Sequence, residues 1–221
     1  MSDSERQPDP QLADMMALIV HDLRNPLATI SANLSFAREV QEFTDQDVIE
    51  SLDDVELALG ELAKGLEQLG WVGRWLGGGV ALTPTPGDIR AVLTKAVEAT
   101  DGVTLSLPDA PVNASLAGAP LTRLVQLLVQ ESLRHGTKVS LSLSSDGVLE
   151  VVDDGVAVGA ELRPVVFTMA GQQALKSRAD GRYAKVVGLL AVRALADTLG
   201  ATLEATGVDG AAKTVIRLKV G

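Results

Sequence analysis

The chain has 221 residues, 46% of them hydrophobic, a formal net charge of −10 and no cysteine, so disulfides and thiolate chemistry are excluded. Its excess of acidic residues lies in residues 1–75, which carry 15 acids and 5 bases, and such a segment repels nucleic-acid phosphates and anionic lipid. Because no apolar run approaches the roughly 18 residues that span a bilayer, and the start does not resemble a secretory signal, we expect a soluble cytoplasmic protein with neither nucleic-acid nor membrane partners.

The first third of the chain predicts a helical hairpin. Residues 1–10 are polar, contain two prolines, and are expected to form a disordered tail. Apolar positions then recur at steps of three and four over residues 12–37 and again over residues 48–69, which predicts two helices. Two such helices leave half of each apolar stripe exposed to water. We therefore expect residues 11–75 to dimerise into a four-helix bundle.

A different pattern follows a boundary rich in glycine and proline. The stretch from Gly70 to Gly87 breaks the helical spacing, and residues 76–87 are expected to be the linker. Residues 88–221 then predict helices at 89–99, 121–134 and 187–199, and strands at 103–107, 138–143, 148–152, 202–205 and 214–220. The pair Asp146-Gly147 is a strong hairpin signal. Helices on one side of a mixed sheet predict an α+β sandwich.

A polar motif interrupts the first predicted helix, where residues 21–27 read HDLRNPL. The heptad spacing puts His21 between the seam positions, so its imidazole is expected to face solvent. Asp22 can accept a hydrogen bond from one ring nitrogen, which fixes the tautomer and leaves the other nitrogen as a nucleophile. Asn25, one turn further, can hold a water molecule or a phosphoryl oxygen. Pro26 removes a backbone hydrogen bond and is expected to kink the helix.

This motif resembles the H-box of bacterial two-component histidine kinases, in which HExxNPL and HDxxNPL are the rule. The resemblance implies that His21 is the phospho-accepting nucleophile and Asp22 its general base. It further implies that Asn25 positions the water that dephosphorylates a partner receiver domain. The structural alternative is a surface histidine beside a helix-bending proline.

From about Asp88 onward, the chain resembles the ATP-binding domain of the same kinases, but its nucleotide motifs differ. Where the family reads NLLxNAxRH, residues 127–135 read LLVQESLRH, so Glu131 replaces an asparagine that ligates magnesium. In the DxGxG box, whose aspartate receives the adenine amino group, Asp153 and Gly155 are kept and Ala157 replaces the second glycine. A glycine at that position permits a positive φ or a close approach that a Cβ hinders.

The two remaining boxes are also eroded. The family's GxGLGLAIVR aligns with residues 183–193, where Gly188 is the only one of its glycines that is kept, and GxGTxF aligns with residues 211–216 and keeps only Thr214. The expected remnant of a nucleotide site is therefore three residues, Asp153, Gly155 and Gly188, and we expect no metal site. In the alternative interpretation, ATP still binds through these residues, with Lys185 or Lys213 touching phosphate.

An intact acceptor motif beside an eroded ATP site favours a histidine phosphotransferase. Such a protein relays phosphoryl groups through His21 between the aspartates of response-regulator receiver domains and needs no cofactor. A hybrid histidine kinase is a further candidate partner. Two other hypotheses stay open. One is a soluble histidine kinase that autophosphorylates His21 with Mg-ATP. The other is a pseudokinase that docks on a kinase or a receiver without carrying phosphate.

Overall fold

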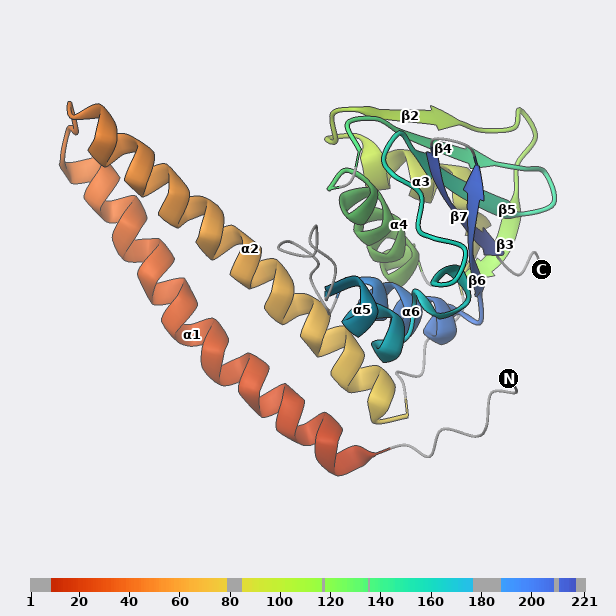
Figure 1. Ribbon diagram of the computed structural model, residues 1–221, viewed down its shortest axis with the longest axis horizontal. Coiled ribbons are helices and arrows are strands. Elements are labelled where there is room, and N and C mark those ends of the chain that lie inside the picture. The colour runs from red at the N-terminus through yellow and green to blue at the C-terminus, as the bar shows by residue number, and fades with distance from the viewer. Residues whose placement is uncertain are drawn as a thin grey trace. The chain divides into compact units, whose positions relative to one another are not determined.

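The computed structural model describes residues 9–78, 85–116, 118–134, 136–176, 188–208 and 211–217. Contacts divide the chain into two compact units, with the division between Gly78 and Gly79. The first unit is a pair of long helices, and the second combines helices with strands (Figure 1).

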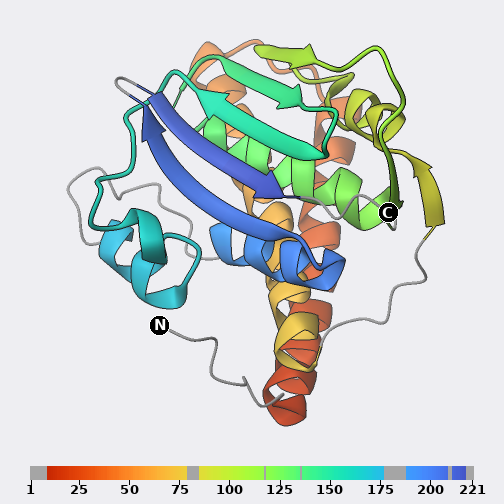
Figure 2. The ribbon, with the colours of Figure 1, turned by 90° about the vertical axis from the view of Figure 1, so that its right-hand side faces the viewer.

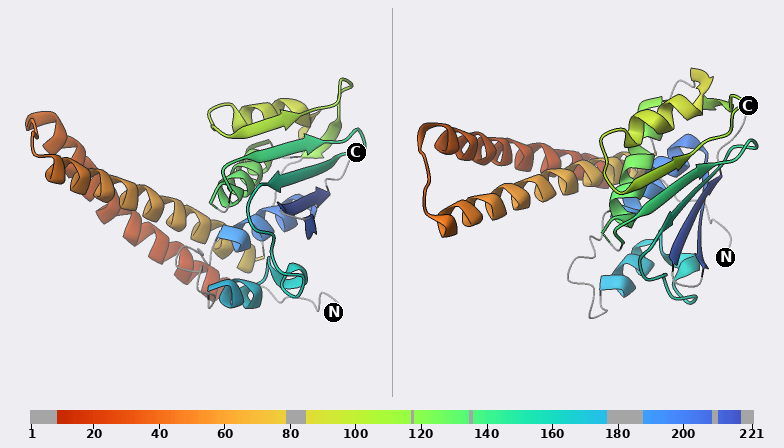
Figure 3. Two further views of the ribbon diagram at one scale, coloured as in Figure 1. Left: turned by 45° about the horizontal axis from the view of Figure 1, so that its top comes forward. Right: turned by 90° about the horizontal axis from the view of Figure 1, so that it is seen from above.

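The first unit is an antiparallel helical hairpin, as the sequence predicts. Helix α1 spans Pro10–Val40 and helix α2 spans Gln46–Leu76, with residues 41–45 between them (Figure 3). Both helices begin at an aspartate whose side chain accepts hydrogen bonds from the first turn. Asp9 accepts from the backbone of α1 at 3.0 Å, and Asp45 accepts from the backbone of α2 at 3.0 Å. Helix α1 thus starts within the segment expected to be a tail.

The hairpin is closed at both ends and packed in the middle. At the base, the backbone N–H of Asp9 donates to the carbonyl of Leu76 at 2.9 Å. Near the tip, the guanidinium of Arg38 donates to Asp53 at 2.6 Å. Between these ties lies a small apolar core made of Val20, Leu27 and Leu66, with Leu59 and Leu69 packed against it.

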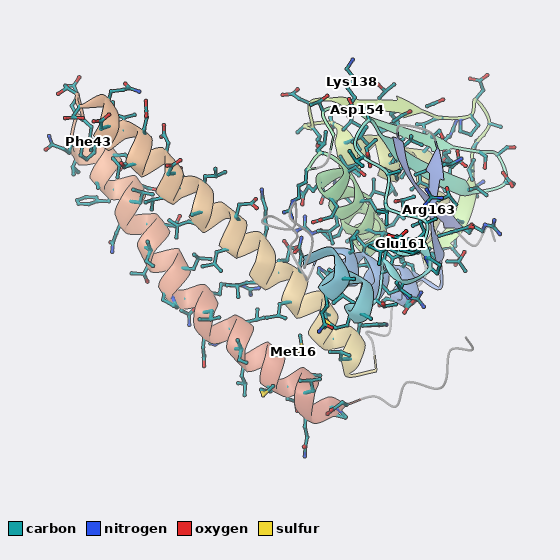
Figure 4. All side chains as sticks on the ribbon, in the orientation of Figure 1. Met16, Phe43, Lys138, Asp154, Glu161 and Arg163 are labelled. Atoms are coloured by element: carbon teal, nitrogen blue, oxygen red, sulfur yellow. The ribbon has the colours of Figure 1, made fainter. Side chains whose placement is uncertain are left out.

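The glycines from Gly70 onward do not end α2, which continues to Leu76, one residue into the linker expected at residues 76–87. The glycines of its last turns permit close contact with α1. A Cβ at Gly73 would lie 3.2 Å from the Cβ of Met16, and one at Gly77 would lie 2.8 Å from the Cβ of Ala13 (Figure 4). Side-chain-free backbone at these positions therefore lets the two helices approach each other.

The second unit contains a five-stranded mixed sheet with strand order β2-β4-β5-β7-β6. Strands β2 and β4 are parallel and the other neighbours are antiparallel. The five strands are β2 (Val103–Ser106), β4 (Val139–Leu143), β5 (Val148–Asp153), β6 (Thr202–Val208) and β7 (Ala211–Arg217). The turn Asp146-Gly147 joins β4 and β5, with Gly147 at φ 82°. The hairpin predicted at this pair is present.

Three helices cover one face of this sheet: α3 (Ile89–Val97), α4 (Gly118–Ser132) and α6 (Gly188–Leu199), of which α4 and α6 lie behind the strands in Figure 2. The core between them contains fully buried leucines from both layers, including Leu93, Leu124, Leu128, Leu141, Leu149 and Leu195. This arrangement confirms the predicted sandwich of helices on a mixed sheet.

Four short elements were not predicted. They are the paired strands β1 (Thr85–Asp88) and β3 (Asn113–Leu116), the 3-10 turn at Arg163–Val165, and helix α5 (Met169–Lys176). Asp88 ends β1 and begins α3: its carboxylate binds the guanidinium of Arg90, which lowers the pKa of Asp88 to about 2. Arg90 also donates to the backbone carbonyls of Pro108 and Asp109, so this pair ties the start of α3 to the segment before β3.

Candidate functional site

His21 lies in the first half of α1 and faces solvent, as its place in the heptad spacing predicts. Its side chain is 72% exposed and that of Asp22 is 77% exposed. The Nδ1 atom of His21 lies 3.1 Å from Oδ1 of Asp22. Because an ionised carboxylate can only accept, this hydrogen bond requires a proton on Nδ1 and leaves the lone pair of the neutral ring on Nε2.

The same segment is anchored by the hairpin core. Val20 and Leu27, on either side of the polar motif, are buried in the cluster with Leu66, whereas His21 through Pro26 are exposed. The buried residues on either side hold this part of α1 against α2, while the side chain of His21 stays accessible. His21 is therefore exposed on a part of α1 that is packed against α2.

Asn25 lies one helical turn after His21 and is exposed, so the side chains of the two residues share a face of α1. Pro26 stands inside an otherwise continuous helix. It has no N–H to donate to the carbonyl of Asp22, four residues earlier, so that carbonyl lacks its helical partner. The backbone carbonyl of Asn25 accepts from the hydroxyl of Thr29 at 3.1 Å. His21, Asp22 and Asn25 are thus close together on one exposed stretch.

At the second candidate site, Glu131 is buried in the α/β unit. It lies on the last turn of α4, is 7% exposed, and its Oε1 forms no hydrogen bond. An Nη1 atom of Arg134 lies 3.3 Å from that oxygen as an ion pair. Burial raises the pKa of Glu131, and the nearby Arg134 lowers it by a smaller amount.

The carboxylate of Glu131 lies against Gly188, the first residue of α6. A Cβ at Gly188 would lie 2.3 Å from Oε1 of Glu131 and 2.6 Å from its carboxyl carbon. The N-terminus of a helix favours negative charge, and it is where many proteins bind a phosphate. In this chain the carboxyl group of Glu131 lies next to the first residue of α6. The glycine retained from the predicted nucleotide motif thus leaves room for Glu131.

Asp153 and Gly155 lie together at the end of β5. Asp153 is 8% exposed, and its Oδ1 accepts from the backbone N–H of Gly155 at 2.9 Å. This contact engages one of the two oxygens that the resemblance assigns to adenine. Ala157 has no positive φ, because among the described residues only glycines do. The local backbone therefore does not require the glycine that Ala157 replaces.

Asp154, the next residue, ties together two segments of the α/β unit, a role that the local sequence does not predict. Its Oδ1 accepts from the backbone N–H groups of Thr137 and Lys138 at 2.6 and 2.9 Å, and its Oδ2 accepts from the Thr137 hydroxyl (Figure 4). These bonds lower the pKa of Asp154. A Cβ at Gly136 would also collide with Oδ1 of Asp154. Asp154 therefore fastens the loop before β4 to the end of β5.

Of the two lysines that could touch phosphate in the alternative interpretation, the structure describes only Lys213. Lys213 is bound to Glu150 of the neighbouring strand at 2.7 Å, so its ammonium is already paired on the sheet. Lys185 and the rest of residues 177–187 lie outside the described residues. Within the described ranges, no group of three or more histidine or acidic side chains could hold a metal ion. None of the described helices has the length and hydropathy of a membrane span.

Comparison with known proteins supports the division into a helical and an ATPase-like unit. Residues 117–221 match the family of histidine kinase-, DNA gyrase B-, and HSP90-like ATPases. Full-length ShkA, solved in complex with AMPPNP, has a TM-score of 0.69 at 16% identity; the match covers 94% of this chain and 47% of ShkA. The histidine kinase AdeS of Acinetobacter baumannii has a TM-score of 0.57 at 19% identity, covering 91% of this chain and 98% of AdeS. No curated protein sequence matches the chain.

At these low identities the solved structures show the fold, which they share with this chain over both units. The chain spans about half the length of ShkA and nearly all of the AdeS structure. The family match covers most of the α/β unit, including α4, α6 and the strands from β4 onward. Residues 117–221 are therefore similar to the histidine kinase-, DNA gyrase B-, and HSP90-like ATPases, and the fold of the chain, a helical region followed by an α/β unit, is that of the solved histidine kinases.

Proposed function

We propose that the chain is a histidine phosphotransferase that relays phosphoryl groups between receiver-domain aspartates through His21. One observation carries this proposal: His21 is exposed and paired with Asp22, whereas Glu131 is buried against the glycine of the ATP motif. The acceptor segment is thus accessible, and the side chain of Glu131 lies against the one glycine that the last nucleotide motif retains.

The transfer needs only the imidazole and the receiver's aspartyl phosphate. The Nε2 lone pair of His21 attacks phosphorus, an N–P bond forms, and the P–O bond to the receiver's aspartate breaks with its electron pair leaving on that carboxylate. The ring then carries a positive charge while Nδ1 keeps its proton. Asp22, 3.1 Å from Nδ1, stabilises that charge. Transfer to a second receiver is the same reaction in reverse.

The residues of the ATPase-like unit do not fit Mg-ATP in the family's manner. The position of the family's magnesium-binding asparagine holds Glu131, whose buried carboxyl group lies against Gly188. One oxygen of Asp153 is engaged by the backbone of Gly155. We therefore assign no step of the proposed reaction to a nucleotide.

The affinity for ATP tests this assignment directly. We expect calorimetry with Mg-ATP to give no measurable binding, or a dissociation constant above the micromolar range, for the unaltered protein. The double substitution Glu131→Asn and Ala157→Gly should improve binding only in part, because residues 183–187 still lack the family's glycines. Micromolar affinity for ATP in the unaltered protein would contradict the proposed phosphotransferase and favour an ATP-dependent autokinase.

We also propose that the helical unit forms a homodimer. Its single hairpin buries few apolar side chains, and eleven large ones stay at least 40% exposed: Met15, Leu18, Ile19, Leu23, Ile30, Phe36, Val40, Val48, Val55, Leu57 and Leu62. Many lie at the same helical spacing as the core residues. A second hairpin packed as a four-helix bundle would remove from water those that lie on the predicted seam: Ile19, Leu23, Ile30, Val48, Val55 and Leu62.

Substitution of Leu62 by aspartate tests the dimer. Leu62 lies on the predicted seam of α2 and is 53% exposed in the hairpin, so a charge there is harmless to a monomer. In a four-helix bundle, each copy loses about 2 kcal/mol of burial and gains a desolvated charge. We expect analytical ultracentrifugation at micromolar concentration to show a dimer for the parent and a monomer for Leu62→Asp. Leu57→Asp, off the seam and 67% exposed, is the matched control and should stay dimeric.

The family match favours one competing function, the soluble autokinase, and a two-part labelling experiment separates it from the relay. The full chain is incubated first with radiolabelled ATP alone, and then with receiver domains labelled by acetyl phosphate. The relay predicts an acid-labile label on this chain only in the second arm. Label from ATP alone supports the autokinase, and no label in either arm supports the docking pseudokinase.

A further inference from the structure

Two arginines of the helical unit take no part in the ion pairs that hold its other cations. Residues 1–75 carry 15 acids and 5 bases, and four of these bases lie in the described part of the hairpin. Arg38 and Lys64 each form an ion pair with an acidic residue of the hairpin. Arg24 of α1 and Arg74 of α2 are exposed, and neither forms an ion pair with a described residue. Both are therefore available to an anionic ligand.

The contact between Val20 and Gly70 brings the two arginines to the same level of the hairpin. Helices α1 and α2 lie side by side (Figure 1), and a Cβ at Gly70 would lie 4.0 Å from Cγ1 of Val20 and 3.8 Å from Nη1 of Arg74. Arg74 thus reaches back along α2 to the place where Val20 meets that helix. Arg24 follows Val20 by one turn, and helical side chains lean toward the N-terminus of their helix. The two guanidinium groups therefore approach each other from opposite directions along the hairpin.

The charge of Arg24 acts on Arg74, as this proximity requires. Partial burial lowers the pKa of Arg74, Glu67 raises it, and the positive charge of Arg24 lowers it again. The Cζ atom of Arg74 lies 4.2 Å from the centroid of the Trp71 ring, so the indole supports one face of the guanidinium. Stacking of this kind leaves the N–H groups at the edge of the guanidinium free to donate. An anion between the two like charges would relieve their repulsion.

His21 lies at the same level, directly after Val20. Helix α1 turns by about 100° per residue, so Asp22 lies about 100° to one side of His21 and Arg24 about 60° to the other. The Nδ1 atom of the ring is 3.1 Å from Oδ1 of Asp22, which leaves Nε2 to carry a phosphoryl group. Residues three apart are neighbours on a helix surface, so the side chain of Arg24 is within reach of that group.

We propose that Arg24 and Arg74 bind the phosphoryl group that His21 receives. This inference rests on the proposed phosphotransfer. The guanidinium N–H groups donate to the phosphoryl oxygens while the N–P bond forms and the P–O bond to the receiver's aspartate breaks, and they take part in neither bond. Arg24 belongs to the HDLRNPL motif, whereas Arg74 comes from the other helix and reaches the site only through the fold of the hairpin.

Phosphorylation of the full chain with phosphoramidate, a small donor that releases ammonia, tests the site without a receiver. Phosphorus-31 magnetic resonance then follows the last deprotonation of the phosphoryl group, and the signal missing from His21→Ala is that of His21. Because nearby cations favour the dianion, we expect the midpoint of this titration to lie about one pH unit lower in the parent than in Arg24→Gln or Arg74→Gln. Lys64→Gln removes an exposed cation elsewhere on α2 and should titrate like the parent. Equal midpoints in all chains would overturn the proposal.

The rate of transfer from a receiver labelled by acetyl phosphate is the second measurement. Each arginine substitution should slow acceptance about tenfold, the usual effect of losing one charge-assisted hydrogen bond, and Lys64→Gln should not. If Arg74→Gln does not fold, Arg24→Gln decides the question, because Arg24 is exposed and no hydrogen bond or ion pair joins it to a described residue. Slower transfer with an unchanged phosphorus titration would mean that the arginines contact the receiver, which also overturns the proposal. A parent that accepts no label contradicts the phosphotransfer itself, whereas the titration still decides the arginine site.

Discussion

His21→Ala is expected to abolish phosphoryl acceptance from a phosphorylated receiver completely, because no other group in the motif supplies a neutral nitrogen lone pair. His21 is exposed and lies outside the hairpin core, so the substitution should leave the helical content and the melting temperature unchanged. Transfer of label from a receiver labelled with acetyl phosphate measures the loss. Label that persists on the His21→Ala chain would remove the relay and leave only a docking role.

Substitutions of Asn25 and Asp22 should separate phosphoryl acceptance by His21 from hydrolysis of the receiver's phosphate. Asn25→Ala leaves the imidazole intact, so acceptance should stay near the parental rate, while loss of phosphate from the receiver to water slows because the positioned amide is gone. Asp22→Asn should give an intermediate rate of acceptance. The amide keeps the shape of Asp22 but not the negative charge 3.1 Å from Nδ1, which raises the basicity of the ring. Equal effects of both substitutions on acceptance would contradict these separate roles.

The fold was predictable because the spacing of apolar residues along the sequence differs between its two units. Spacing of three and four residues predicted the hairpin, and the Asp146-Gly147 turn correctly predicted the pairing of β4 with β5. The strands β1 and β3 were not found, because β1 contains Pro86 and Gly87 and β3 contains Asn113 and Ala114, which are poor strand formers. Similarly, Gly73 and Gly77 suggested a break in the helical pattern. They instead allow close contact with Met16 and Ala13 of α1.

The candidate sites were predictable to different degrees. The exposure of His21 follows from its place between seam positions, and its pairing with Asp22 requires only adjacent residues. The burial of Glu131 does not follow from local pattern, because its contact with Gly188 joins residues 57 positions apart in sequence. The hydrogen bonds of Asp154 had one weak signal in the sequence, an aspartate pair at the end of a strand. Their donors, Thr137 and Lys138, become evident only in three dimensions.

The contact between Glu131 and Gly188 predicts that a larger residue at position 188 destabilises the α/β unit. Gly188→Ala should lower the free energy of unfolding by about 1–3 kcal/mol, the usual cost of overpacking a buried site. The new Cβ would lie 2.3 Å from Oε1 of Glu131, and that carboxylate is buried beside Arg134 and has little room to move. Chemical denaturation followed by circular dichroism measures the difference. Gly118→Ala, in the first turn of α4 with nothing within 4 Å, is the matched control and should change stability little.

A double-mutant cycle shows whether the clash with Glu131 is the cause. In a Glu131→Ala background, Gly188→Ala should cost little or even stabilise the first turn of α6, because the obstructing carboxylate is absent and alanine is the better helix former. In a Glu131→Gln background the cost should persist, because glutamine keeps the size of the side chain while removing its charge. Rescue by Glu131→Gln would mean that charge, and not space, sets the cost. Equal destabilisation in all three backgrounds would show that Gly188 is required for a reason other than Glu131, and the internal carboxylate would then no longer explain why this glycine is retained.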